Sequence, residues 1–110
     1  MAAPRKISSE TVFDALGSPI RRQIMGLLAR GPMPVGAIAT VLPVTRPAVS
    51  KHLKLLEQAR LVRHDRKGTQ NLFQLSPDGF RSARHWLDGF WDEALSRYAD
   101  VADRLQRDGR

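Results

Sequence analysis

The fold of this chain is decided by the stretch TRPAVSKHLKLLEQA (residues 45–59) and by the residues that follow it. Thr45 can cap a helix at this point and Pro47 fits its first turn, so a helix is predicted over the whole stretch. Residues 61–66 and 70–75 are then predicted to form two strands of a hairpin, joined near a Lys-Gly dipeptide. The centre of the chain therefore combines one well-marked helix with one hairpin.

Three shorter helices are predicted ahead of this stretch, over residues 9–16, 18–29 and 35–41. Ser9 and Ser18 are suitable N-caps for the first two, and apolar residues recur at helical spacing within each segment. Glycine and proline separate the segments. Two helices joined by a tight turn and followed by a hairpin have the order of a winged helix-turn-helix.

A long final helix is predicted from Ser76, because a cap, a first-turn proline and an acid at the positive helix end follow one another there. Its apolar residues cover about half of the circumference, whereas a stripe that faces a core needs only about 100°. We therefore expect one arc to pack on the domain and the other to meet a second copy; the pattern does not decide which flank does so. The residues predicted at this dimer interface are Phe13, Trp86, Phe90, Trp91, Leu95 and Tyr98.

The expected architecture is mainly α with a β-hairpin: a winged helix-turn-helix of five helices and a two-stranded wing. The 110 residues suffice for one domain, which we place at residues 9–105, between a disordered lead (residues 1–8) and a frayed tail (residues 106–110). A domain of this size has a marginal core, which is a second reason to expect a homodimer.

The net charge of +7 is concentrated in the middle of the chain. Residues 18–75 contain ten basic and two acidic side chains, whereas residues 1–17 are neutral and residues 76–110 carry one net negative charge. A generally basic surface would spread the surplus evenly, so a surplus confined to one segment indicates a site for a polyanion. The segment with the predicted helix-turn-helix and hairpin is therefore expected to bind nucleic acid.

Several classes of protein are excluded by composition. The absence of cysteine rules out disulfides and thiol chemistry and fits a reducing, cytoplasmic compartment. The first ten residues lack the apolar run of a signal peptide, and no stretch is apolar enough for a membrane helix. No Ser/His/Asp spacing, phosphate loop, zinc signature or carboxylate pair predicts an enzyme or a cofactor.

The polar face of the helix at residues 45–59 has the chemistry that the DNA major groove requires. Short side chains permit close approach to base edges, and Arg and Lys can donate to guanine or to phosphates; the alternative is an ordinary solvated face. His52 and Leu55 project to the inward side, where His52 is interpreted as a core or buttressing residue. The residues of this helix predicted to contact DNA are Thr45, Arg46, Pro47, Ser50, Lys51 and Lys54.

The predicted hairpin tip is rich in cations and amides, and such a ribbon can reach the DNA backbone or the minor groove. The alternative is that hairpin tips are polar whatever their function. Arg21 and Arg22, near the start of the second helix, fit phosphate contacts and a plain surface pair equally well. The wing residues predicted to contact DNA are Arg63, His64, Arg66, Lys67, Thr69 and Gln70.

From residue 13 to about residue 78 the chain resembles the ArsR (arsenic-repressor) family of bacterial winged-helix regulators. The resemblance rests on FDALGSPIRRQIMGLLARGPMPVGAIA (residues 13–39), RPAVSKHLKLLEQARLV (residues 46–62) and RKGTQNLFQL (residues 66–75). It implies a homodimeric repressor that binds an inverted repeat in double-stranded promoter DNA, often its own promoter. A non-specific, nucleoid-type DNA binder is the alternative, and it would lack an operator preference of at least about a thousandfold.

The chain departs from the metal-sensing members of that family. One sensing site in the family uses paired cysteines in the third helix, and another begins the last helix with an acid-x-His pair, where this chain has PDGF (residues 77–80). A branch without a metal site is therefore expected, and the sequence identifies no inducer. His85, Asp88 and Asp92 share a helix face and are the remaining metal candidates, although a solvated polar face is the plainer interpretation.

Overall fold

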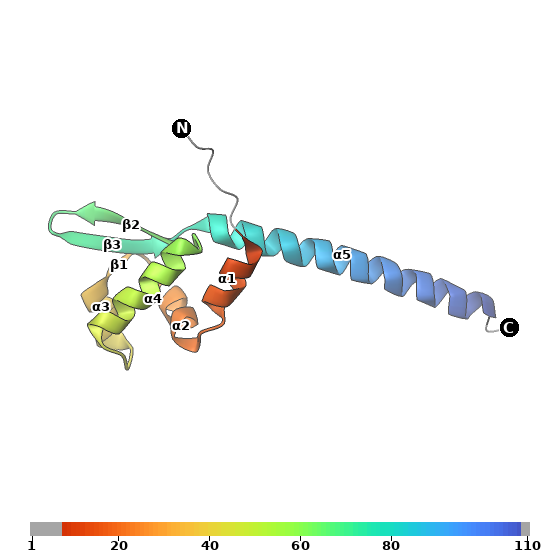
Figure 1. Cartoon of the computed structure of the whole chain (residues 1–110), viewed down its shortest axis with the longest axis horizontal. Coiled ribbons are helices and arrows are strands. Elements are labelled where there is room, and N and C mark those ends of the chain that lie inside the picture. Colours follow the sequence, from red (N-terminus) through yellow and green to blue (C-terminus); the bar gives the residue numbers. More distant parts are fainter. Residues whose placement is uncertain (1–7, 109–110) are drawn as a thin grey trace, which may run out of the picture.

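Over residues 8–108, which the computed structural model describes, the chain forms five helices and a small antiparallel sheet (Figure 1). The helices are α1 (Ser9–Leu16), α2 (Pro19–Leu28), α3 (Val35–Val41), α4 (Arg46–Gln58) and α5 (Pro77–Asp108). The strands are β1 (Met33–Pro34), β2 (Val62–Lys67) and β3 (Gln70–Leu75), in the sheet order β1-β3-β2. The predicted mainly α fold with a hairpin is confirmed.

The sheet contains one strand more than the predicted two-stranded wing. β1 pairs antiparallel with β3, so that Met33 lies opposite Phe73 and Pro34 lies opposite Leu72. Proline is tolerated here because β1 is an edge strand, where its missing N–H removes no ladder bond. Two residues are too few to show any alternation of apolar and polar side chains, so this strand could not be predicted from the sequence.

The hairpin begins and turns slightly later than predicted. β2 starts at Val62 because the backbone N–H of Leu61 donates to Leu56 at 3.0 Å and so closes the end of α4. The loop consists of Gly68 and Thr69, and Gly68 has a φ of 61°. A positive φ at the first loop residue alone is the pattern of a type II′ turn, in which glycine is preferred.

The helix caps follow the prediction with small shifts. The hydroxyls of Ser18 and Thr45 each accept a bond of 3.3 Å from a backbone N–H in the first turn of α2 and α4. Ser8, and not Ser9, occupies the cap position of α1. α5 continues to Asp108, past the predicted end near residue 105, because no glycine or proline interrupts it there. Residues 1–7 of the predicted lead lie outside the described residues.

The core lies among α1–α4 and the inner face of the hairpin. Its largest fully buried side chains are Val12, Ile24, Ile38, Val49, Leu53, Leu56 and Leu61. Leu55, predicted on the inward side of α4, is 44% exposed, because it lies at the edge of the apolar stripe and not in its centre. The stripe itself is as predicted and orients α4 on the core.

The first turns of α5 sit on the end of α4, and the rest of this helix projects away. The N–H of Gly79 donates to the carbonyl of Arg60 at 2.8 Å, and a Cβ at Gly79 would lie 2.4 Å from the carbonyl oxygen of Ala59. Only Gly79 and Ala83 of α5 are buried. We call residues 8–83 the head and residues 84–108 the arm.

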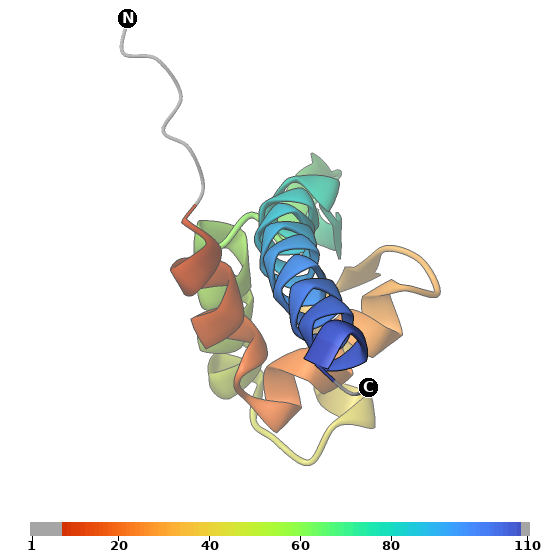
Figure 2. The same cartoon turned by 90° about the vertical axis from the view of Figure 1, so that its right-hand side faces the viewer.

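The arm gives the molecule an extended shape. Figure 1 shows the hairpin and the arm leaving the head in opposite directions, and Figure 2, which looks along α5, shows α1 beside the base of the arm. The radius of gyration is 19.7 Å, whereas a compact domain of this length has about 13 Å. None of the described helices, α5 included, is long and apolar enough to cross a membrane.

Candidate nucleic-acid interface

The polar face of α4 is exposed to solvent because the opposite, apolar face of the helix is buried in the core. Val49, Leu53 and Leu56 are almost completely buried and fix the rotation of the helix. All six residues predicted to contact DNA from this helix are exposed: Thr45, Arg46, Pro47, Ser50, Lys51 and Lys54. The arrangement leaves two lysines, an arginine and a serine free to approach a groove.

Arg46, at the start of α4, lies beside α3. A Cβ at Gly36 would be 3.8 Å from the Nη1 atom of Arg46, so the guanidinium passes directly over this glycine. A Cβ at Gly36 would make an ordinary van der Waals contact with Arg46, which places the arginine at the junction of the two helices. Because Arg46 is exposed, its guanidinium can donate to DNA from the position where α3 and α4 meet.

Arg21 and Arg22 have structural partners at the end of α1. The guanidinium of Arg21 donates to the carbonyls of Ala15 at 2.6 Å and Asp14 at 3.2 Å, and that of Arg22 donates to Leu16 at 2.7 Å. These carbonyls are among those that a helix end leaves without an intrahelical partner. Both arginines thus stabilise the end of α1, and phosphate contact by either of them stays a prediction.

His52 supports the same corner of the head. Its Nδ1 atom lies 3.4 Å from Nη1 of Arg21, and the side chain is only partly exposed. The histidine joins α4 to α2 through this contact, which agrees with its interpretation as a buttressing residue. His52 does not lie on the exposed polar face of α4.

All six wing residues predicted to contact DNA are exposed, and one of them, His64, also contacts α4. Arg63, Lys67, Thr69 and Gln70 are exposed, and Arg66 is exposed while its Nε donates to the carbonyl of Gly68 at 3.2 Å. His64 is different, because its Nδ1 lies 2.6 Å from a carboxylate oxygen of Glu57 on α4. The side chain contacts α4 through this atom and is 41% exposed, so phosphate contact by His64 stays a prediction.

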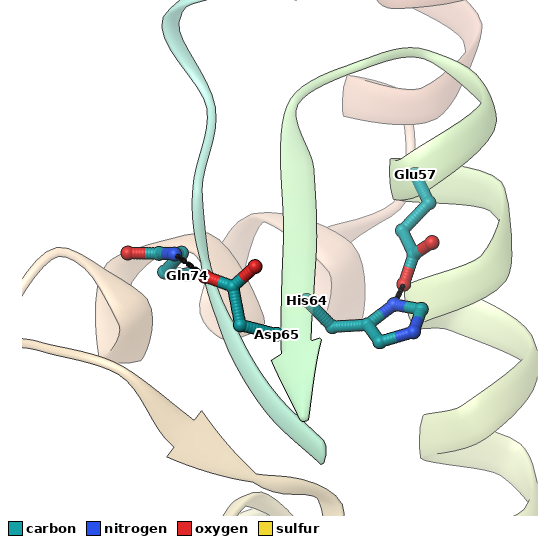
Figure 3. Close-up of polar contacts among 4 residues, drawn as sticks. All are labelled: Glu57, His64, Asp65 and Gln74. Atoms are coloured by element: carbon teal, nitrogen blue, oxygen red, sulfur yellow. Dashed lines mark hydrogen bonds and ion pairs between the residues drawn. The ribbon is translucent and has the colours of Figure 1, made fainter. Parts of the chain in front are cut away.

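Figure 3 shows that His64 and the next residue, Asp65, point to opposite sides of β2. Asp65 accepts a bond of 2.7 Å from the side-chain amide of Gln74 on β3. These polar contacts were not predicted from the sequence. The available signal was that Glu57 and Asp65 are the two acidic residues of an otherwise basic segment, residues 18–75.

The residues predicted at the dimer interface form an exposed apolar surface in the single chain. Phe13 packs edge-on against Trp86 at a centroid distance of 5.5 Å, and Trp86 stacks on Phe90 at the same distance. Beside this ladder, α1 and α5 enclose an open groove of about 620 Å³ whose lining includes Phe13, Leu16, Phe80, Leu87 and Trp91. Leu95 and Tyr98 lie farther along the arm and are 58% and 73% exposed.

The described residues bring together no group of three or more His, Asp or Glu side chains that could hold a metal ion. His85, Asp88 and Asp92 lie on the polar side of the arm and are exposed. Asp88 is 3.8 Å from the guanidinium of Arg84, in an exposed pair along the helix. Within one chain, these three residues are thus part of a solvated face.

Comparison with known proteins gives consistent results. The family described as "Helix-turn-helix domain" matches residues 16–65. The chain is 47% identical over 96 residues to the HTH-type transcriptional regulator Rv2034 of Mycobacterium tuberculosis, covering 87% of this chain and 90% of that protein. It is 34% identical over 79 residues to the transcriptional repressor SdpR of Bacillus subtilis, covering 72% and 88%.

Two solved structures are also similar. An ArsR-like transcriptional regulator from Rhodococcus sp. RHA1 has a TM-score of 0.78 at 27% identity, covering 86% of this chain and 90% of that one. The homodimeric winged helix-turn-helix DNA-binding domain of Mb0332 from Mycobacterium bovis has a TM-score of 0.60 at 32% identity, covering 80% and 82%. The similarity therefore extends over the winged helix-turn-helix and part of α5.

Proposed function

The chain belongs to the ArsR family of winged helix-turn-helix transcriptional regulators, and from this premise we propose that it is a homodimeric repressor that binds an inverted-repeat operator. The observation that carries the proposal is the face of α4. Four side chains there, Arg46, Ser50, Lys51 and Lys54, are exposed on a helix whose opposite face is locked into the core. Short donors and cations on a rigid helix are suited to base edges in the major groove.

The charge distribution supports DNA as the partner. The wing adds Arg63, Arg66 and Lys67 to the cations of α4, and all of them are exposed. A winged helix-turn-helix places its second helix in the major groove, where a basic ribbon beside it can reach the backbone or the minor groove. A regulator of transcription acts where the chromosome is, so we also propose a cytoplasmic location.

The apolar residues of the arm indicate that the other partner is a second copy of the chain. Apolar residues repeat along it with alternating spacings of four and three: Leu87, Trp91, Ala94, Tyr98, Val101 and Leu105. This is the seam of a helix that packs on another helix. Leu87, Trp91, Tyr98, Val101 and Leu105 are all exposed in the single chain. We propose that this flank, together with the α1–α5 groove, faces the partner. The homodimeric state of the Mycobacterium bovis domain supports a second copy as that partner.

A two-fold dimer explains the form of the operator. Two recognition helices related by a two-fold axis contact equivalent half-sites about 34–36 Å apart, which is one turn of DNA. The operator would then be an inverted repeat. A repressor of this kind can control its own promoter, and the promoter of its own gene is therefore the first DNA to test.

The proposal is tested by selecting bound DNA from a random pool and footprinting it, with the chain's own promoter included. We expect an inverted repeat, bound by two copies, with an affinity at least about a thousandfold above that for scrambled DNA at physiological salt. Equal affinity for all duplexes would favour the non-specific DNA binder. Protection of a single half-site by one copy would contradict the dimer.

A further inference from the structure

The basic segment contains only two carboxylates, Glu57 and Asp65, and both contact side chains of the hairpin. Glu57 Oε1 lies 2.6 Å from His64 Nδ1, and Asp65 Oδ2 accepts a bond of 2.7 Å from Gln74 Nε2 (Figure 3). Negative charge on a surface that faces DNA opposes the attraction of the phosphates. A carboxylate on this surface therefore needs a function that outweighs its repulsion of the phosphates.

His64 is held from two directions. Its ring packs on Phe73, which is directly opposite on β3, with 5.1 Å between the ring centroids, and Phe73 is itself buried. Glu57 approaches the Nδ1 atom of the histidine from the last turn of α4. One imidazole thus joins the core, the wing and the end of the recognition helix.

We propose that Glu57 and His64 are a positioning pair, which fixes the angle between the recognition helix and the wing so that both reach one DNA site. The backbone between α4 and β2 is a short turn in which Arg60 has a φ of 55°, a left-handed conformation that is rare for arginine. A side-chain contact just beyond this turn prevents the hairpin from swinging about it. The inference rests on the proposed binding of a specific operator.

The pair has little effect on folding, which makes its effect on DNA binding separable. The side chains of His64 and Glu57 are 41% and 30% exposed, and exposed ion pairs contribute little to the free energy of unfolding. The pair lines an open cavity of about 400 Å³, and Arg60, Arg63 and Asp78 also line it. Neutralisation of these arginines is the competing role for Glu57, and it does not require His64.

The experiment compares four single variants in operator affinity, scrambled-duplex affinity and melting temperature. Glu57→Met and His64→Phe break the contact from either side, and the phenyl ring keeps the packing on Phe73. Glu57→Gln removes the charge but keeps an acceptor for His64. Asp65→Asn is the matched control, because it removes the same charge and keeps an acceptor for Gln74.

We expect Glu57→Met and His64→Phe each to weaken operator binding about fivefold, with an unchanged melting temperature and no loss of affinity for scrambled DNA. The double variant should be no weaker than either single variant. Glu57→Gln should bind the operator at least as tightly as the wild type, as should Asp65→Asn. If His64→Phe alters the melting temperature, His64→Gln, which keeps a donor but no ring, should restore operator binding.

Two outcomes would contradict the proposed positioning role of Glu57 and His64. The first is that Glu57→Met tightens operator binding as Asp65→Asn does, which would make Glu57 merely an unfavourable charge. The second is that His64→Phe and His64→Gln differ from wild type only in stability. Failure of the wild type to prefer the operator over scrambled DNA would instead contradict the proposed function, and it is measured first.

Discussion

The head and the arm treat apolar side chains in opposite ways. In the head, residues such as Ile24, Ile38 and Leu53 are covered by other parts of the same chain. In the arm, Trp91 is 56% exposed and Leu105 is 67% exposed, although the arm belongs to the same continuous helix as the buried Ala83. In proteins, most of the stability of a helix comes from packing of its apolar face on other elements. The head therefore covers its own apolar residues, whereas the apolar side chains of the arm are left uncovered by the same chain.

The largest effect is expected from a charge on the arm. Trp91→Glu should prevent pairing of the arms, because burying a carboxylate in an apolar interface is strongly unfavourable. Two linked half-sites bind more tightly than one, so operator affinity should fall by about 10²–10⁴-fold without any change in a DNA contact. Sedimentation would report the loss of the dimer, and circular dichroism would exclude unfolding. Ser96→Glu, on the polar side of the arm, is the control and should remain dimeric.

Truncation of the recognition face tests the head. Arg46→Ala, Ser50→Ala and Lys51→Ala should each weaken operator binding by about 1–3 kcal/mol if they contact bases. The dimer should persist in all three, because these exposed residues lie far from the arm. Fluorescence anisotropy and sedimentation on the same samples would check both statements. Wild-type affinity in all three variants would show that α4 is not the helix that recognises DNA.

One substitution made in each region of α5 should act with opposite signs. Gly79→Ala places a Cβ 2.4 Å from the carbonyl oxygen of Ala59, and such overpacking destabilises a protein by about 1–3 kcal/mol. Gly89→Ala meets nothing within 4 Å and should stabilise the helix by about 1 kcal/mol. Thermal unfolding of both variants provides the comparison. A Gly79→Ala protein as stable as the wild type would mean that the head and the arm are loosely joined.

Removal of charge from the wing should have a smaller and less selective effect. Arg66→Ala and Lys67→Ala should weaken binding to operator and scrambled DNA alike, and each should flatten the salt dependence by about one unit per lost phosphate contact. Affinities measured over a series of salt concentrations report the slope directly. A loss confined to the operator at an unchanged slope would indicate base contacts in place of phosphate contacts.

The smallest effect is expected from metals, because we propose that the chain belongs to a branch without metal sensing. The acid-x-His start is missing from α5, and cysteine is absent. Operator affinity in EDTA should therefore match that in stoichiometric zinc or nickel. A change of more than tenfold would contradict this, and Asp92→Asn and His85→Ala would then be the first variants to make, since a dimer can supply a second copy of that face.

The sequence predicted those parts of the fold that local chemistry determines. Thr45, Pro47 and the spacing of Val49, Leu53 and Leu56 define α4 within the stretch itself, and the structure agrees to within a residue. The same reasoning could not detect β1, whose two residues form a strand only because β3 passes beside them. Pairing between strands depends on tertiary packing, which no local pattern contains.

The candidate site shows the same division. Exposure of Arg46, Ser50 and Lys51 follows from the helical projection and could be predicted. The partners of Arg21 and His64 could not, because the first depends on the angle between α1 and α2 and the second on where β2 passes α4. Both contacts depend on the three-dimensional arrangement, and phosphate contact by either residue stays a prediction.

The close approach at Gly79 has a consequence for the DNA and not only for the protein. Each added base pair between two half-sites turns one relative to the other by about 35° and moves it by about 3.4 Å. A regulator whose subunits are connected by flexible linkers can follow such changes. Here α5 starts against the end of α4, with 2.8 Å between Gly79 N and Arg60 O. We therefore expect the spacer between half-sites to have one permitted length. The protein would then select operators by the number of base pairs in the spacer, although it contacts none of them.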